Sequence, residues 1–156
     1  MTKLGELCRL IGLEQARLQA VLARLSEADS EFVLSFQGEP VSDLPAALAR
    51  VQAEGPSLQG SLAVAGVELL ALIDPSEESP SRWDLDFVFW VDHAFLGRPL
   101  GEQQTRLRAL VQLGFELCAV GAGRELVISD EGYRPGSRGG GTTLWSSEGS
   151  SAWGAT

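Results

Sequence analysis

The sequence of 156 residues contains no asparagine, one lysine, one histidine and only two cysteines. Cys8 and Cys118 lie far apart and form neither a metal-ligand spacing nor a Cys-x-x-Cys pair. This sparse use excludes a disulfide framework and predicts two buried thiols in a reducing compartment. The missing asparagine and scarce lysine indicate a biased genome composition and carry no mechanism.

Long apolar runs are also missing. No segment approaches the ~18 consecutive apolar residues that a membrane-spanning helix requires. The first residues lack the apolar core of a secretory signal peptide. We therefore expect a cytoplasmic protein that makes no membrane contact.

Positive charge is in short supply as well. Twelve lysines and arginines stand against 21 aspartates and glutamates, which gives a formal net charge of −9. This balance repels nucleic-acid phosphates and favours basic partners, so general DNA or RNA binding is not expected. The hydrophobic fraction of 44% is ordinary for a globular domain. A chain of ~150 residues can bury a core without metal or disulfide support.

The stretch from Arg82 to His93 predicts a long strand, because β-branched and aromatic residues dominate it. Side chains alternate between the two faces of a strand. One face would then be wholly apolar, with Trp83, Leu85, Phe87, Phe89 and Val91. The other would mix acids with an indole, with Asp84, Asp86, Val88, Trp90 and Asp92. The first face predicts a core, and the second predicts a surface that contacts a partner.

Hydrophobic spacing predicts the elements that precede this strand. Residues 3–28 are expected to be helical, with a kink or a break near Gly12, because glycine costs about 1 kcal/mol inside a helix. Residues 31–37 alternate in polarity and predict a half-buried strand. A helix capped by Ser42 or Asp43 should then follow and end at Gly55.

Residues 58–65 and 67–73 predict two strands joined at Gly66, with a single helix through both as the alternative. After the Arg82–His93 strand we expect a helix over residues 102–113 that stops at Gly114. A hairpin of strands at 115–120 and 124–130 should follow, turning at Gly121-Ala122-Gly123.

Strands joined by tight turns imply a mostly antiparallel sheet. The sequence therefore predicts an α+β fold, with a single domain over residues 1–131, about six strands and helices packed on one face. Residues 132–156 form a Gly/Ser-rich tail that is too loose for a regular element. Because Trp145 and Trp153 are too apolar for an inert linker, a docked tail and a flexible tail both stay open.

Asp84 and Asp86 would point the same way from one strand, and paired carboxylates can hold Mg²⁺. With Asp92 they support an alternative hypothesis, a Mg-dependent nucleotidyl- or phosphotransfer enzyme. However, no basic residues surround the pair to bind a triphosphate. The single histidine, His93, is accompanied by no serine or cysteine nucleophile signature. An enzyme is therefore the lesser expectation, and no catalytic residue or cofactor is predicted.

Trp90 among Asp84, Asp86 and Asp92 would suit an arginine-rich partner through cation–π and charge-assisted contacts. We therefore predict a non-enzymatic, acidic interaction protein that binds a basic protein partner with these four residues. A bacterial antidote that inhibits a cationic toxin is one class of such protein. The competing interpretation buries Trp90 under a helix or the tail. A further alternative is a self-associating module joined through the tail tryptophans.

Overall fold

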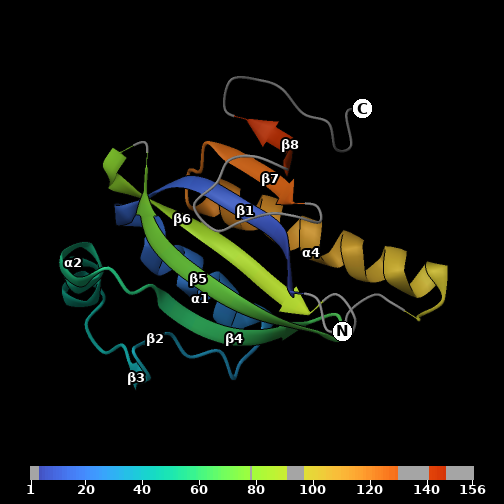
Figure 1. Cartoon of the computed structure of the whole chain (residues 1–156), viewed down its shortest axis with the longest axis horizontal. Helices are drawn as coiled ribbons and strands as arrows, with labels where there is room; N and C mark the ends of the chain where they lie inside the picture. Colours follow the sequence, from blue (N-terminus) through green and yellow to red (C-terminus); the bar gives the residue numbers. More distant parts are fainter. Residues whose placement is uncertain (1–3, 78, 91–96, 130–140, 147–156) are drawn as a thin grey trace.

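The computed structural model describes residues 4–77, 79–90, 97–129 and 141–146. These residues form a single α+β domain with an antiparallel sheet, as the sequence predicts (Figure 1). The sheet has eight strands in the order β3-β2-β4-β5-β6-β1-β7-β8, which is more than the expected six. Every strand pair is antiparallel.

The elements and their bounds follow the chain in this order: β1 (Leu4–Glu14), the 3-10 helix η1 (Gln15–Arg17), α1 (Leu18–Ala28), β2 (Ser35–Phe36), β3 (Glu39–Pro40), α2 (Leu44–Glu54), β4 (Leu58–Val64), β5 (Val67–Ser76), β6 (Ser79–Trp90), α4 (Leu100–Val120), β7 (Glu125–Ser129) and β8 (Gly141–Ser146). The first strand of the chain lies between β6 and β7. Residues from both ends of the chain therefore meet on one sheet.

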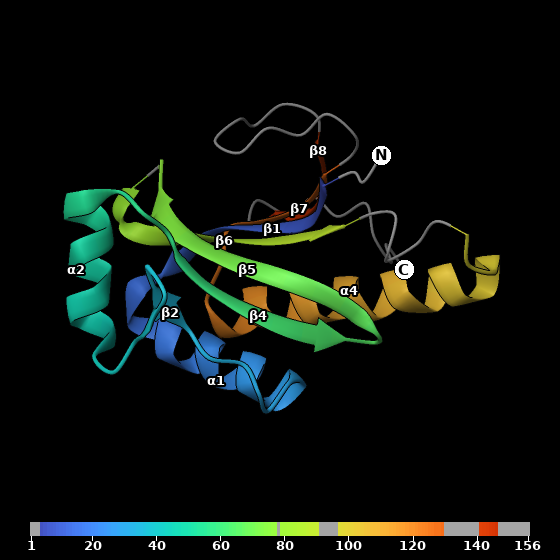
Figure 2. The ribbon, with the colours of Figure 1, turned by 60° about the horizontal axis from the view of Figure 1, so that its bottom comes forward.

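Helices α1 and α4 lie on the same side of the sheet, while α2 stands at one end of it (Figure 2). We call the side under α1 and α4 the helix face. Its strand residues are buried and form the core with the helices: Leu10, Leu13, Leu58, Leu62, Val67, Leu69, Ala71, Ile73, Trp83, Leu85, Phe87, Phe89 and Leu126. Two of the helices, α1 and α4, thus pack on one face, as expected.

The beginning of the chain was predicted wrongly. Residues 3–28 were expected to be helical, but Leu4–Glu14 is a strand and the α-helix begins only at Leu18. The pairing of β1 with β6 shifts register at two irregularities, between Glu6 and Cys8 and between Leu10 and Leu13. These shifts place apolar residues three positions apart on the same face, so a bulged strand imitates helical spacing.

The second error concerns α4. We expected a helix over 102–113 and a strand over 115–120, but one helix runs from Leu100 to Val120. Gly114 lies inside it and is buried, along with Leu110, Leu117 and Cys118. Burial of these side chains outweighs the ~1 kcal/mol that a glycine costs in a helix. The expected hairpin does not form, and β7 pairs with β1 and β8 instead.

The predicted helix after Asp43 is confirmed as α2. The Asp43 carboxylate accepts a hydrogen bond from the Ala46 amide at 3.2 Å, which caps the helix. Gly55 ends it with a φ of 97°, a conformation that glycine adopts without strain. The β4–β5 hairpin is also confirmed, and its turn at Ala65 and Gly66 has positive φ at both residues.

The strand expected over residues 31–37 is reduced to β2, Ser35–Phe36. Its alternation is nonetheless real, because Phe32, Leu34 and Phe36 are buried while Val33 is 57% exposed. The pattern therefore indicated which side chains enter the core, although the backbone is mostly not a strand.

The tail expected over residues 132–156 contains a regular element. Residues 141–146 form β8, which pairs with β7 at the end of the sheet. Trp153 and the rest of the predicted tail lie outside the described residues. A docked tail and a flexible tail therefore both stay predictions. None of the helices in the described ranges combines the length and apolar character needed to span a membrane.

Cys118 is buried, as predicted, while the side chain of Cys8 lies outside the described part of the chain. Burial raises the pKa of the Cys118 thiol to about 12. This thiol is held against the Glu125 carbonyl at 3.7 Å and is a packing group of the core.

Candidate interaction surface on the sheet

The predicted alternation along β6 is present in the structure. Trp83, Leu85 and Phe87 enter the core, and the Trp83 indole donates to the Gln15 side-chain oxygen at 3.0 Å. Asp84 and Asp86 lie on the opposite side of the strand, as predicted. We call that side the open face, because no helix of the described ranges covers it (Figures 1 and 2).

Asp84 and Asp86 are nevertheless buried, at 5% and 9% exposure, and both pair with Arg9 of β1. The Arg9 Nη2 atom lies 3.4 Å from Asp84 Oδ2, and Arg9 Nε lies 3.3 Å from Asp86 Oδ1. Arg9 is itself only 7% exposed. One guanidinium therefore pairs with two buried carboxylates.

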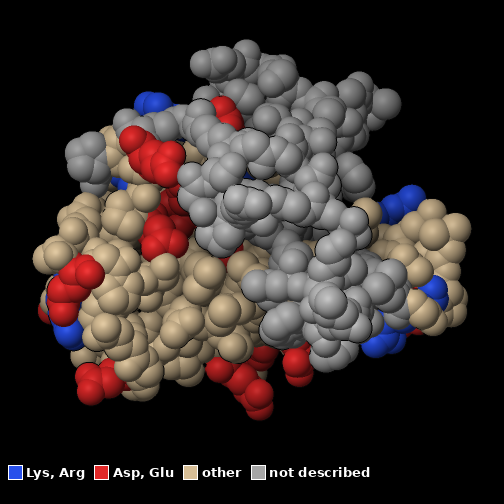
Figure 3. Space-filling model, viewed as in Figure 1, with Lys and Arg blue, Asp and Glu red and all other residues tan. Residues whose placement is uncertain are grey.

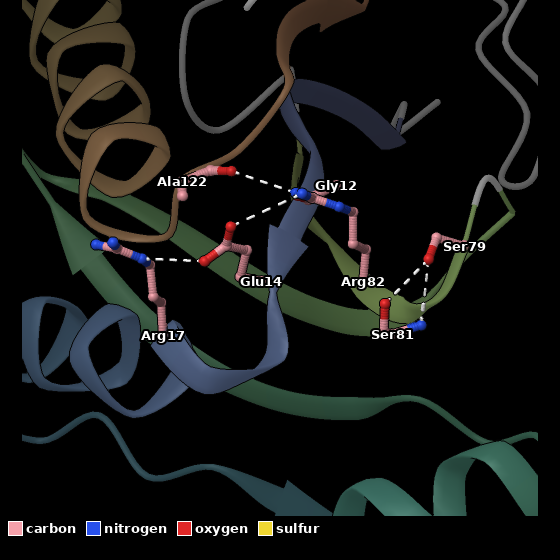
Figure 4. Close-up of polar contacts among 7 residues, drawn as sticks. All are labelled: Gly12, Glu14, Arg17, Ser79, Ser81, Arg82 and Ala122. Atoms are coloured by element: carbon pink, nitrogen blue, oxygen red, sulfur yellow. Dashed lines mark hydrogen bonds and ion pairs between the residues drawn. The ribbon is translucent and has the colours of Figure 1, made fainter.

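The irregular end of β1 gives Asp84 a second partner. The Gly12 amide donates to Asp84 Oδ1 at 3.0 Å, and Gly12 has a φ of 77°, which favours glycine. The Gly12 carbonyl accepts from Arg82 Nη1 at 2.7 Å. Figure 4 shows the Arg82 guanidinium reaching the Ala122 carbonyl and Glu14 as well. These contacts tie β1, β6 and the turn after α4 together at one point.

The ionisation of Asp84 reflects two opposed effects. Burial raises the pKa of its carboxyl above the ordinary value and dominates. The Gly12 amide, the Arg9 charge and a hydrogen bond from Ser76 each act to lower the pKa. Asp84 is therefore an acid whose charged form is held in place by specific contacts and not by water.

Strand β5 pairs with β6 and contributes the neighbouring residues of the open face. Asp74 of β5 is the partner of Asp84, and the Ser57 hydroxyl donates to the Asp74 carboxylate. Leu72 lies opposite Asp86, and Leu70 opposite Val88. Leu70, Leu72 and Val88 are half-buried, and Glu68 before them is exposed. The open face of β5 thus carries two leucines, Leu70 and Leu72, between two acids, Glu68 and Asp74.

Most arginines of the described chain form ion pairs with acids of the same chain. Arg9 pairs with Asp84 and Asp86, Arg17 and Arg82 with Glu14, Arg24 with Glu116 and Glu27, Arg50 with Glu54, and Arg98 and Arg106 with Glu102. Within the described residues, the acids Glu68, Asp74 and Glu77 form no such pair. Figure 3 shows acidic side chains on this side of the molecule, toward the β5–β6 end and at the lower margin.

Two of the predicted site residues cannot be placed. Asp92 lies outside the described residues, as does His93, and only the backbone of Trp90, the last residue of β6, is described. Asp84 and Asp86 lie on the same side of β6, as the Mg²⁺ hypothesis requires. However, both carboxylates already pair with the guanidinium of Arg9 on β1. No group of three potential metal-ligating side chains occurs among the described residues.

The residue that sequence reasoning missed is Arg9. The helical interpretation of residues 3–28 gave no reason to place Arg9 beside the acids of another strand. An extended interpretation puts Arg9 on the side opposite Leu10, which is where an arginine can meet the acids of a neighbouring strand. No protein-family model matches this chain, and no curated protein is detectably similar to it.

Proposed function

We propose that this protein is a non-enzymatic interaction protein that binds a basic protein partner over the open face. The observation that carries this proposal is the distribution of charge. The arginines are mostly engaged with acids of their own chain, whereas Glu68, Asp74 and Glu77 form no ion pair within the described residues. A surface with unbalanced acids attracts cationic partners and speeds their association.

The residues predicted from the sequence take different parts in this proposal. Asp84 and Asp86 lie beneath the surface, where they pair with Arg9 and hold β1 against β6 under the exposed acids. Trp90 and Asp92 stay in the proposed contact on the strength of the sequence pattern alone. An inhibitor of a cationic toxin in a bacterial cytoplasm is one protein of this class.

Binding of a fluorescein-labelled peptide of alternating arginine and alanine, followed by anisotropy, tests the proposal. We expect saturable binding that weakens as salt rises, and no binding of the matching glutamate–alanine peptide. Glu68→Gln and Asp74→Asn should each weaken binding by about two- to five-fold, the range of a single exposed charge pair.

Glu54→Gln is the matched control, since it removes the same charge from a residue that pairs with Arg50 on α2. It should leave the affinity within error of the wild type. Equal losses from all three variants would mean that only net charge matters, and equal binding of both peptides would overturn the proposal.

A second candidate, self-association, is favoured by the position of β8. This strand is last in the sheet, and its sequence Gly141–Ser146 contains no charged residue and no proline. Edge strands that lack such residues tend to pair with another strand. A dimer mass by light scattering that Thr143→Lys converts to a monomer would support this candidate, and a monomeric wild type at high concentration would exclude it.

A further inference from the structure

Two groups of acids lie near the two ends of β5, and each contributes one acid, Asp74 or Glu68, to the open face of this strand. The first, which we call the β5–β6 acidic group, consists of half-buried Asp74 and exposed Glu77. The buried cluster of Arg9, Asp84 and Asp86 lies next to it, since Asp74 and Asp84 are register partners.

The second, which we call the hairpin acidic group, lies near the turn between β4 and β5. It consists of Glu68 on the open face of β5, together with Asp29 and Glu31, which follow α1 and lie near β4. The Asp29 carboxylate accepts a hydrogen bond from the Ala63 amide at 2.8 Å, and Ala63 is the register partner of Glu68. The Glu31 amide donates to the same carboxylate at 3.0 Å. These two backbone hydrogen bonds hold the pKa of Asp29 below its ordinary value, so the group stays ionised.

The surface between the two groups carries no charge on β4 or β5. Leu70 and Leu72 occupy the open face of β5, and Val88 lies beside Leu70 on β6. Gln59 and Ser61 are their partners on β4. Glu68 and Asp74 are six residues apart on one strand, which corresponds to about 20 Å at the rise of an extended chain.

We infer that the partner presents a segment with cationic side chains about 20 Å apart and aliphatic side chains between them. This inference rests on the proposed function and adds the pattern of the partner to it. The end groups of the face require positive charge, and a second copy of this acidic chain, a nucleic acid or an anionic membrane would be repelled. The middle offers leucine and valine side chains that can still lose water on contact.

Two peptides of identical composition test this pattern. Both contain four arginines, three leucines and three serines. The bipolar peptide has two arginines at each end and the leucines at alternate positions between them, and the clustered peptide has all four arginines at one end. The bipolar peptide should bind at least about five-fold more tightly in anisotropy titrations, because only it can reach both acidic groups at once.

Variants assign the contacts. Glu68→Gln and Asp74→Asn should each weaken the bipolar peptide more than the clustered one, with Glu54→Gln as the unaffected control. Leu72→Ser should weaken both peptides, and Val88→Thr repeats this test with a smaller change of shape. Circular dichroism melts of each variant confirm that it is folded before its affinity is compared.

The outcomes separate the two proposals. Equal affinity for both peptides, with both still bound more tightly than an acidic peptide, overturns the inference and leaves the proposed function standing. No binding of either peptide defeats both. If the chain forms a dimer that Leu72→Ser dissociates, a second copy covers this face, and the inference is overturned.

Discussion

Arg9 lies on the open face, where it is buried between two acids, Asp84 and Asp86. Removing water from three charges is costly, and the cost is offset only while the partners remain in contact. The Gly12 amide, which donates to Asp84, is a further part of this balance. Loss of one partner is therefore expected to be far more damaging than loss of an exposed ion pair.

Replacing Arg9 with methionine removes the cation that pairs with both buried carboxylates, Asp84 and Asp86. We expect the free energy of unfolding, measured by urea denaturation at neutral pH, to fall by about 3–5 kcal/mol. The loss should be smaller at pH 4, where the carboxyl groups can take up protons. Arg17→Met is the control, since its pair with Glu14 is exposed and should contribute at most about 1 kcal/mol. Equal losses from both variants would contradict this account.

Asp84 gives a prediction about pH. Its pKa is higher in the folded chain than in the unfolded chain, mainly because of burial, so the folded chain binds this proton more tightly. Asp84 thus lowers the free energy of unfolding as pH rises from 3.8 through its folded pKa. Asp84→Asn removes that dependence, so its stability relative to the wild type should improve between pH 4 and pH 7.

Asp29 supplies a control of opposite sign. Its pKa is lowered by the amides of Ala63 and Glu31, so its stabilising effect is present above the unfolded pKa and is lost as pH falls. Asp29→Asn should therefore lose stability relative to the wild type as pH rises. Urea denaturation at several pH values measures both differences, and parallel curves for the two variants would refute the assignment.

At the scale of elements, the irregular segment before β2 packs against β4, although the sequence predicted a strand there. Beyond the short pairing with β2, Gly60 lies against residues 32 and 33 of the preceding segment. A Cβ atom at Gly60 would stand 2.5 Å from Phe32 Cε2 and 2.8 Å from the Val33 carbonyl oxygen. The absence of a side chain at Gly60 therefore allows Phe32 to enter the core beside the sheet.

Gly60→Ala is expected to force Phe32 and the Val33 backbone away from β4. Overpacking of this kind typically costs about 1–3 kcal/mol of unfolding free energy, which thermal or urea denaturation measures. Gly101→Ala is a matched control, because no atom lies within 4 Å of the added carbon in the first turn of α4. It should be neutral or gain up to about 1 kcal/mol. A neutral Gly60→Ala would show that this close contact is absent.

At the scale of the molecule, the charge is unevenly distributed. A net charge of −9 makes like charges repel in the compact state, and the acids of the two acidic groups form no ion pair within the described chain. Salt screens exposed charges over about 8–10 Å at physiological strength. The excess negative charge that attracts a basic partner also makes the folded chain repel itself. The folded state should therefore be less stable when salt is low.

Raising sodium chloride from low to physiological concentration at pH 7 should increase the melting temperature by about 2–4 °C, equivalent to roughly 1 kcal/mol in a chain of this size. Differential scanning calorimetry measures the change. The Glu68→Gln, Asp74→Asn double variant should show a smaller increase. A melting temperature that falls with salt would mean that the ion pairs outweigh the repulsion.

Local patterns predicted the middle of the chain well. Asp43 and Gly55 bound α2, and the alternation around Trp83 and Asp84 marks both faces of β6. These features depend on neighbours within a few residues. The ends of the chain were harder, because a bulged β1 has helical spacing and Gly114 resembles a helix stop that burial overrides.

The sequence alone determined the fold class, the acidic balance, and the two faces of β6, because composition and strand periodicity depend only on local order. The tertiary structure decided what those faces contact. Asp84 meets Arg9 across 75 positions of sequence, since β1 inserts between β6 and β7. Pairing between distant strands depends on which of several apolar surfaces is buried against which, and no local pattern encodes that choice.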